Sequence, residues 1–199
     1  LSFESAMYRL GGHVISVENA NESSSSTKGE TIEDTIRIVD NYADLIVLRH
    51  PEVGMVARAA AVSEVPIINA GDGVGQHPTQ AFLDLYTIDR EIGRTDDFHI
   101  AFVGNLAYYR TARSLAYLLG KYNNVKMTFV SGPELRMKDD VKEYLKEKNV
   151  QFDETEDLES TMRVVDVVYQ TRIAEEWIPD HDQYEKLRGK YIITRLMTD

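Results

Sequence analysis

The chain of 199 residues contains no cysteine, which excludes disulfide bonds and metal sites built from thiolate ligands. It contains no apolar run near the roughly 18 residues that a membrane-spanning helix needs. Its first residues show no basic segment followed by an apolar one, so no signal peptide is recognisable. We therefore expect a cytoplasmic protein that makes no contact with membranes.

Histidine is also scarce, since the chain has 5 and they share no local spacing. No cluster of His, Asp and Glu has the spacing of metal ligands, and the patterns of a P-loop, a zinc protease and a nucleophile elbow are missing. The single Gly104 after an apolar run is not the three-glycine signature of a dinucleotide site. The sequence thus predicts a reaction without metal or cofactor, which depends on positioning and electrostatics.

The chain has fewer basic than acidic residues. It contains 22 Lys and Arg and 33 Asp and Glu, which give a formal net charge of -11. Such a chain repels polyanions, so we expect no nucleic-acid partner. A site for a small anion must gather arginines, lysines and helix N-termini locally.

Short apolar runs rich in Val and Ile alternate with segments of helical periodicity. This rhythm predicts an α/β protein with two doubly wound parallel-sheet domains and helices on both faces. The predicted strands are His13–Val17, Leu45–Leu48, Ile67–Asn69, Ile100–Val103, Lys126–Val130, Asp166–Tyr169 and Tyr191–Thr194. The predicted helices are one capped by Thr31 that carries Ile32, Ile36 and Val39 on one face, and then Val53–Val62, Pro78–Ile92, Thr111–Leu119 and Asp139–Lys148.

A domain boundary is predicted at Pro78, where a long helix leads from one strand series to the next. The first domain then comprises residues 1–77 and the second residues 78–199. The chain starts at Leu1 in the middle of a helical pattern without a capping signal, and it stops five residues after a predicted strand. We interpret the sequence as a fragment in which the first domain is incomplete and the C-terminal part of the second domain is missing.

The segment Asn69–Gln80 is the strongest local candidate for a site. It places three glycines between a predicted strand and a helix that begins with Pro78, which makes His77 the expected N-cap. A helix N-terminus at the carboxyl end of a parallel strand binds anions readily, and His77 and Gln80 would both point into it. The alternative is a glycine-rich turn with a capping histidine, and position alone favours neither interpretation.

Three arginines come after predicted strands, one directly after its strand, one two residues further on and one at the start of the following helix, and the carboxyl ends of strands are where α/β sheets bind ligands. They are Arg49, Arg110 and Arg172. A lone arginine at a strand end is more often a surface residue, but three at three strand ends favour a substrate with several negative charges. Lys28 lies in a Ser-rich loop, and loop composition alone indicates only a solvated lysine.

Several short segments resemble the catalytic chain of the aspartate carbamoyltransferase family, within the aspartate/ornithine carbamoyltransferase superfamily. They occur in the order and with the spacing of that family. The resemblance covers essentially the whole chain, and it is the combination of segments that is specific. The segments are Leu1–Glu4, Arg9–Gly12, Lys28–Thr31, Arg49–Pro51, Asn69–Gly73, Gln76–Gln80, Tyr109–Thr111 and Thr171–Arg172.

The resemblance implies that the first domain binds carbamoyl phosphate and that the second binds L-aspartate. Members of the family transfer the carbamoyl group to the aspartate amine, giving N-carbamoyl-L-aspartate and phosphate, an early step of pyrimidine synthesis. By motif position, Arg49 and His77 contact carbamoyl phosphate and polarise its carbonyl oxygen. Gln80 contacts the carbamoyl amide, and Ser24 belongs to the carbamoyl phosphate site.

The resemblance also implies that Arg110 and Arg172 bind the carboxylates of aspartate, together with Lys28. The loop that carries Ser24 and Lys28 reaches in this family into the active site of a neighbouring subunit. A homotrimer with shared active sites is therefore implied, in some members assembled further with zinc-binding regulatory chains.

The sequence departs from the family pattern at three points. The family's Ser-x-Arg-Thr-Arg motif, which binds phosphate, is absent, as is its His-Pro-Leu-Pro motif. Ala174 stands where the family has a glutamine two residues after Arg172. We expect that these 199 residues alone do not turn over, and that Ala174 weakens aspartate binding or shifts the amino-acid preference.

Two other functions compete with this one. Ornithine carbamoyltransferase shares the fold and a similar His-Pro-x-Gln pattern, but its second substrate is cationic and would be repelled by Arg110, Arg172 and Lys28. A non-catalytic binding subunit fits the missing phosphate motif. A truncated enzyme is favoured over it, because His77, Gln80 and the three arginines are all retained.

Overall fold

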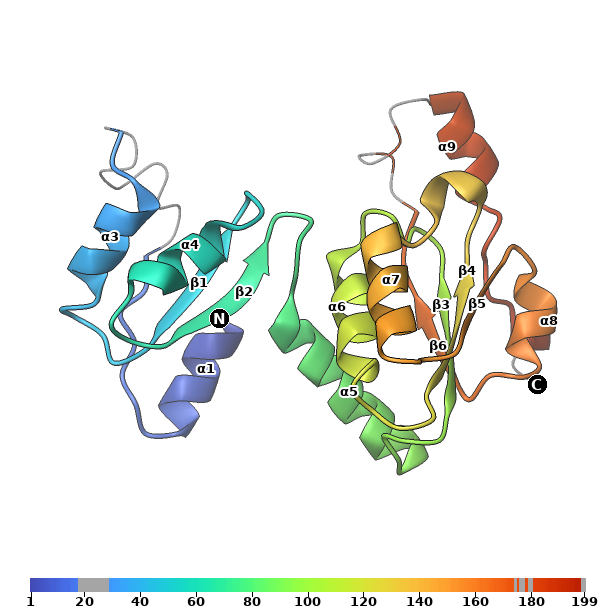
Figure 1. Ribbon diagram of the computed structural model, residues 1–199, viewed down its shortest axis with the longest axis horizontal. Helices are drawn as coiled ribbons and strands as arrows, with labels where there is room; N and C mark the ends of the chain where they lie inside the picture. Colours follow the sequence, from blue (N-terminus) through green and yellow to red (C-terminus); the bar gives the residue numbers. More distant parts are fainter. Residues whose placement is uncertain (18–28, 174, 176–177, 179–180, 198–199) are drawn as a thin grey trace. The chain divides into compact units, whose positions relative to one another are not determined.

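The computed structural model describes residues 1–17, 29–173, 175, 178 and 181–197 of the chain (Figure 1). The chain forms two compact units, Leu1–Gly75 and Gln76–Asp199. The division falls at Gln76, whereas the sequence predicts it at Pro78. Each unit has its own hydrophobic core.

The first unit contains two parallel strands covered by two helices. Its strands pair with Ile46 opposite Ile67, and Thr31 caps α3 as predicted, because its hydroxyl oxygen accepts a hydrogen bond from the Asp34 N–H at 3.2 Å. The core forms where Ile36 of α3 and Ala59 of α4 meet Ile46. The elements are α1 (Ser2–Arg9), α3 (Ile32–Val39), β1 (Ile46–His50), α4 (Met55–Val62) and β2 (Ile67–Asp72).

The second unit contains a four-stranded parallel sheet with the strand order β5-β4-β3-β6. Its strands are β3 (His99–Val103), β4 (Lys126–Val130), β5 (Phe152–Thr155) and β6 (Val167–Gln170). Its α-helices are α5 (Pro78–Ile92), α6 (Arg110–Leu119), α7 (Asp139–Glu147), α8 (Leu158–Met162) and α9 (His181–Leu187), and its short 3-10 helices are Pro133–Leu135 and Arg195–Met197.

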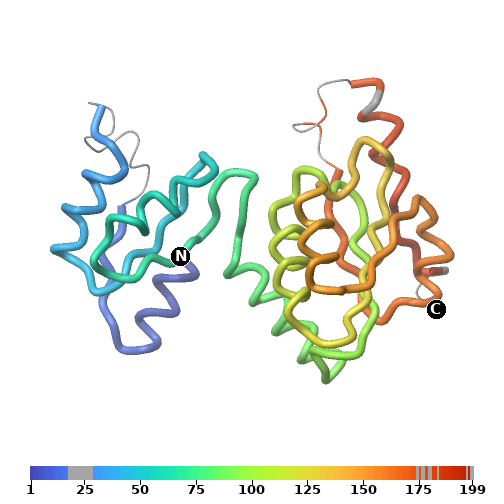
Figure 2. The backbone as a smooth tube through the Cα atoms, in the orientation of Figure 1, coloured from blue at the N-terminus to red at the C-terminus, as the bar shows by residue number. Residues whose placement is uncertain are grey.

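Strand β3 divides its side chains between the two faces of this sheet. Ile100 and Phe102 join a core cluster with residues of α5, α6 and α7, whereas Ala101 and Val103 join a second cluster with Leu158 of α8. Helices α6 and α7 lie on one side of the sheet in Figure 1 and α8 on the other, and Figure 2 shows the same layers as a backbone trace. The prediction of parallel sheets with helices on both faces is confirmed for this unit.

The strand order reverses between β3 and β6. The chain runs outward from β3 through β4 to β5 and then returns to place β6 against the free edge of β3. Loops that leave two such neighbours in opposite directions open a crevice at the carboxyl ends of the strands, which is where ligands bind in sheets of this kind. Arg110 and Arg172 follow the two strands that flank this point.

Gly104 allows the loops after β3 and β6 to approach each other closely. Its φ of 109° is in the left-handed region, and a Cβ there would lie 2.6 Å from the carbonyl oxygen of Thr171. Thr171 is buried and bonds to Val103 O through both its N–H, at 2.8 Å, and its hydroxyl, at 3.0 Å. These contacts hold together the starts of the two loops that lead from β3 to Arg110 and from β6 to Arg172.

Two predicted strands are wrong. His13–Val17 is irregular, with Ile15 80% and Val17 68% exposed. Tyr191–Thr194 is a turn followed by irregular chain, although Tyr191 is buried and packs in the cluster that contains Val103. An apolar run becomes a strand only where another strand offers its backbone groups, and among the described residues neither run pairs with one.

One strand was not predicted, because β5 has the sequence Phe-Asp-Glu-Thr and only one apolar side chain. It lies at the edge of the sheet and is recruited by backbone pairing with β4, with Met127 opposite Phe152. The remaining predicted strands and helices begin and end within three residues of the observed bounds.

None of the helices in the part of the chain that the structure describes has both the length and the apolar character of a membrane span.

Candidate active site

The candidate residues fall into both units. Arg49 lies in the first unit, and His77, Gln80, Arg110 and Arg172 lie in the second. Ser24, Lys28 and Ala174 lie outside the residues that the structure describes.

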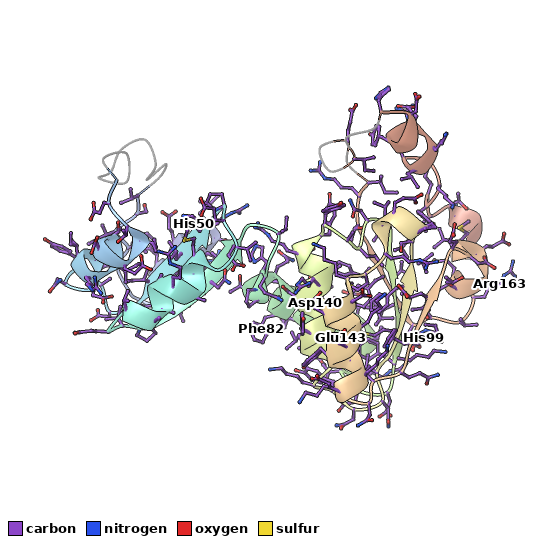
Figure 3. The ribbon with its side chains drawn as sticks, turned by 45° about the horizontal axis from the view of Figure 1, so that its top comes forward. His50, Phe82, His99, Asp140, Glu143 and Arg163 are labelled. Atoms are coloured by element: carbon purple, nitrogen blue, oxygen red, sulfur yellow. The ribbon has the colours of Figure 1, made fainter. Side chains whose placement is uncertain are left out.

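In the first unit, close packing of the loops after β1 and β2 fixes the strand end that carries Arg49. His50, labelled in Figure 3, accepts a backbone hydrogen bond from the Gly73 N–H at 2.8 Å. A Cβ on Gly73 would lie 2.5 Å from the carbonyl oxygen of Pro51, so only glycine allows this approach. The buried carboxylate of Asp72 accepts a hydrogen bond from the Gly54 N–H at 3.1 Å. The side chain of Arg49 is exposed.

In the second unit, His77 stands at the N-cap of α5 as predicted, followed by Pro78 at the first helical position. Its backbone N–H donates to the hydroxyl of Ser114 on α6 at 2.8 Å, and that hydroxyl donates to the side-chain oxygen of Gln76 at 2.5 Å. The imidazole Nδ1 lies 3.4 Å from the Thr79 hydroxyl. Ser114 is only 4% exposed, so a buried hydroxyl anchors the segment that carries His77.

Gln80 lies in the first turn of α5 and is bound by another residue of the same helix. Its Nε2 donates to Asp84 Oδ1 at 2.9 Å, and Asp84 Oδ2 accepts from the Tyr169 hydroxyl of β6 at 3.1 Å. Burial raises the pKa of Tyr169 to about 12, so the hydroxyl stays protonated at neutral pH. The helix that carries Gln80 is therefore tied to the strand that leads to Arg172.

Arg110 and Arg172 are brought to the same edge of the sheet. Arg110 is the first residue of α6, and the Tyr109 before it accepts a hydrogen bond at its phenol oxygen from Nε of Arg172 at 2.5 Å. Arg172 also lines a cavity of about 550 Å³, together with Arg188 and residues 170–173 and 191–193. A chain with a net charge of -11 thus concentrates guanidinium groups at this edge.

Sequence reasoning missed Ser114, Asp84 and Tyr169. Each forms a hydrogen bond with a partner that lies far away along the chain. Ser114 is 37 residues from His77, and Tyr169 is 85 residues from Asp84. A small polar residue on the buried face of α6 is a signal that could have indicated Ser114.

The arrangement supplies positive charge and fixed donors rather than a nucleophile. Within the described ranges, no group of three or more His, Asp and Glu side chains could hold a metal ion. Guanidinium groups and the N-terminus of a helix such as α5 can each bind anions and can stabilise charge that develops on an oxygen during a reaction.

The comparison with known families decides the relationship. A family model described as "Aspartate/ornithine carbamoyltransferase, carbamoyl-P binding domain" matches residues 1–90, and one described as "Aspartate/ornithine carbamoyltransferase, Asp/Orn binding domain" matches residues 96–199. The chain belongs to the aspartate/ornithine carbamoyltransferase family. Arg49, His77 and Gln80 lie within the first match, and Arg110 and Arg172 within the second.

Relatives in this carbamoyltransferase family are similar over almost the whole chain. The pea protein named aspartate carbamoyltransferase 3, chloroplastic, is 58% identical over 196 residues, which are 98% of this chain and 50% of the relative. The catalytic subunit of Methanocaldococcus jannaschii aspartate transcarbamoylase superposes with a TM-score of 0.89 and 54% identity, covering 100% of this chain and 64% of that one.

A Trypanosoma cruzi aspartate transcarbamoylase, solved in complex with carbamoyl phosphate and aspartate, superposes with a TM-score of 0.88. It is 38% identical, and the match covers 99% of this chain and 62% of that one. The chain spans about half the length of the curated plant relatives that it matches.

Proposed function

We propose that this chain carries active-site residues of an aspartate carbamoyltransferase. The reaction transfers the carbamoyl group of carbamoyl phosphate to the amine of L-aspartate and releases N-carbamoyl-L-aspartate and phosphate, as a step of pyrimidine biosynthesis. The observation that carries the proposal is the pair of arginines, Arg110 and Arg172, at the two strand ends that flank the reversal of strand order. Relatives of 46–58% identity that bear the name of this enzyme support it.

Arg49, His77 and Gln80 are the proposed catalytic residues, and they bind carbamoyl phosphate together with Ser24. The attack of an amine on the carbonyl carbon builds negative charge on the carbonyl oxygen. His77, at the N-terminus of α5, and Arg49 stabilise that charge, and each donor of this kind contributes about 3–4 kcal/mol. Phosphate is a weakly basic leaving group, so no covalent nucleophile on the protein is needed.

Arg110, Arg172 and Lys28 are the proposed ligands of the aspartate carboxylates. The hydrogen bond from Arg172 to Tyr109 supports this role, because it orients one guanidinium beside the start of the helix that carries the other. Ornithine carries a cationic side chain, which these positive charges repel, and aspartate is therefore favoured. Residues 1–77 are assigned to carbamoyl phosphate and residues 78–199 to aspartate. The family model described as the carbamoyl-P binding domain extends further, to residue 90, and so includes Gln80 as well as His77.

Assembly into a homotrimer with shared active sites is a further part of the proposal. It is supported by the resemblance of the Ser24–Lys28 loop to the family's intersubunit loop. The same resemblance implies that the trimer can assemble further with zinc-binding regulatory chains, as in some members of the family. Analytical ultracentrifugation of the full-length gene product tests the assembly, and a monomer at micromolar concentration contradicts it.

Localisation in the cytoplasm is proposed from the sequence, whereas several plant relatives have names that include the word chloroplastic. A fluorescent fusion of the full-length gene product, imaged in its own cell type, distinguishes the two compartments.

The decisive assay supplies radiolabelled carbamoyl phosphate and follows transfer of the label to L-aspartate by the full-length gene product. We expect labelled carbamoyl aspartate, with transfer abolished in His77→Ala. The same assay on the 199 residues alone tests whether they turn over without the Ser-x-Arg-Thr-Arg motif, and a near-normal rate refutes that part of the proposal. A full-length product that binds carbamoyl phosphate without transferring it is instead a non-catalytic binding subunit.

A further inference from the structure

The orientation of the Gln80 side-chain amide is determined by its neighbour on α5. Gln80 Nε2 donates to Asp84 Oδ1 at 2.9 Å, one helical turn further along. A carboxylate can only accept hydrogen bonds, so it must face the nitrogen end of the Gln80 amide. The two ends of an amide are otherwise hard to tell apart, and here the chemistry of Asp84 settles which is which. The carbonyl oxygen of Gln80 is consequently turned away from Asp84.

Asp84 is in turn fixed from another element. The Tyr169 hydroxyl of β6 donates to its second oxygen at 3.1 Å. The Tyr169 ring packs against the core, with its centroid 5.6 Å from that of Phe102. Burial raises the pKa of Tyr169 to about 12, so its hydroxyl remains a donor at neutral pH. Both oxygens of Asp84 are therefore engaged, one by its own helix and one by the sheet.

We propose that Asp84 is a positioning residue that makes Gln80 present its carbonyl oxygen, an acceptor, to the carbamoyl group of the substrate. The inference rests on the proposed function. An acceptor at this place pairs with the N–H of a carbamoyl amide and gains nothing from a methyl group in the same position. Asp84 thereby acts through Gln80 to select a carbamoyl group over an acetyl group of nearly the same shape.

The test uses the full-length gene product and the nearly isosteric variant Asp84→Asn. An asparagine side chain can donate as well as accept, so Gln80 can turn its amide either way. We expect the ratio of carbamoyl phosphate to acetyl phosphate affinity, measured by calorimetry, to fall about tenfold, while the affinity for inorganic phosphate changes less than twofold. Asp89→Asn, at an exposed position on the same helix, serves as the matched control and leaves the ratio unchanged.

Two further variants separate a positioning role from a structural one. Tyr169→Phe removes only the hydroxyl that holds Asp84 and is expected to lower the ratio about threefold. In a Gln80→Ala background, Asp84→Asn is expected to have no additional effect on the ratio, because Asp84 acts only through Gln80. If Asp84→Asn fails to fold, the same comparison is made with Tyr169→Phe, measured in the wild-type protein and in the Gln80→Ala background.

An unchanged ratio in Asp84→Asn, or an equal loss of affinity for all three ligands, overturns the inference about Asp84. So does an effect of the same size in the Gln80→Ala background. These outcomes leave carbamoyl transfer by the wild-type protein intact. A wild-type protein that does not bind carbamoyl phosphate overturns the proposed function instead.

Discussion

The buried hydroxyl of Ser114 joins α6 to the start of α5, because it accepts from the His77 N–H and donates to Gln76. Ser114→Ala removes both bonds from a site that is almost inaccessible to water, at a cost of about 1–3 kcal/mol. We predict that kcat for carbamoyl transfer falls about tenfold, because His77 is no longer held in place. Steady-state kinetics check this, with Ser160→Ala at an exposed position of α8 as the control. Equal kcat values for both variants would contradict the role of Ser114.

Arg172 is predicted to determine the KM for aspartate. Arg172→Ala should raise that KM about 100-fold, and Arg172→Lys about tenfold, because lysine keeps the charge but loses the planar fork that binds a carboxylate at two points. The affinity for carbamoyl phosphate, measured without aspartate, should stay unchanged in both variants. A KM for aspartate that does not respond to Arg172→Ala counts against the assignment.

The arginines could be predicted from sequence, whereas their supports could not. Arg172 comes shortly after the apolar run Asp166–Tyr169, and Arg110 opens the helix that follows Ile100–Val103, so the pattern itself places both after strands. Ser114 and Tyr169 act through hydrogen bonds to residues 37 and 85 positions away, and Asp84 also bonds across one turn of its own helix. The local sequence shows at most that Ser114 is a polar residue on a buried helix face, and it does not reveal the partner of any of the three.

Among the structural elements, the junction between β3 and β6 depends on Gly104. Gly104→Ala combines a φ of 109° with a Cβ placed 2.6 Å from Thr171 O, and it should lower the free energy of unfolding by about 2–3 kcal/mol. Gly93→Ala is the matched control, since Gly93 has a φ of 72° but open space around it, and we expect a loss of about 1 kcal/mol. Chemical denaturation followed by fluorescence measures both. Equal losses would show that contact with Thr171 does not limit this position.

The carboxylate of Asp140 on α7 bonds to residues of α6, and its charge depends on pH. Arg113 Nη1 donates to Asp140 Oδ1 at 2.8 Å, and the Tyr117 hydroxyl donates to Asp140 Oδ2 at 3.0 Å. The bond from Arg113 holds the pKa of Asp140 below its usual value. The unfolded carboxylate then takes up its proton at a higher pH than the folded one. The stabilisation is therefore complete above about pH 4 and is lost as the pH falls through the folded pKa.

Asp140→Asn should accordingly lower the free energy of unfolding by about 0.5–1 kcal/mol at pH 7, a small value because water screens the half-exposed carboxylate. The difference from the wild type should shrink as the pH falls below about 4 and through the lowered pKa of folded Asp140. Thermal melts at pH 7 and at a series of acidic pH values check this. Glu143→Gln, on the exposed face of the same helix, is the control, and both positions are labelled in Figure 3. A difference that persists in acid would rule out the ionised carboxylate as its cause.

Helices were predicted correctly where the apolar periodicity and the capping residues indicated the same bounds. Helix α5 starts at Pro78 and ends at Ile92 as predicted, because proline favours the first position and Gly93 adopts the left-handed conformation that ends the helix. Strands depended on partners that the local sequence does not contain. The polar run Phe152–Thr155 pairs with β4, whereas the apolar run His13–Val17 forms no strand.

Over the whole molecule, the alternation of strands and helices was sufficient to predict parallel sheets, because consecutive parallel strands require a crossover connection. The strand order β5-β4-β3-β6 was not predictable from that alternation alone. It emerges from the packing of whole strands, and it is the reversal in this order that brings Arg110 and Arg172 to neighbouring strand ends. Two guanidinium groups, those of Arg172 and Arg188, line one cavity in a chain whose formal net charge is -11.

The central proposal is that the full-length protein that carries these residues transfers a carbamoyl group to aspartate. The most direct measurement offers the full-length gene product radiolabelled carbamoyl phosphate with L-aspartate and, separately, with L-ornithine. We predict labelled carbamoyl aspartate and no labelled citrulline, with the aspartate reaction lost in His77→Ala. Transfer to ornithine, or binding of carbamoyl phosphate without transfer to either amine, would contradict the account.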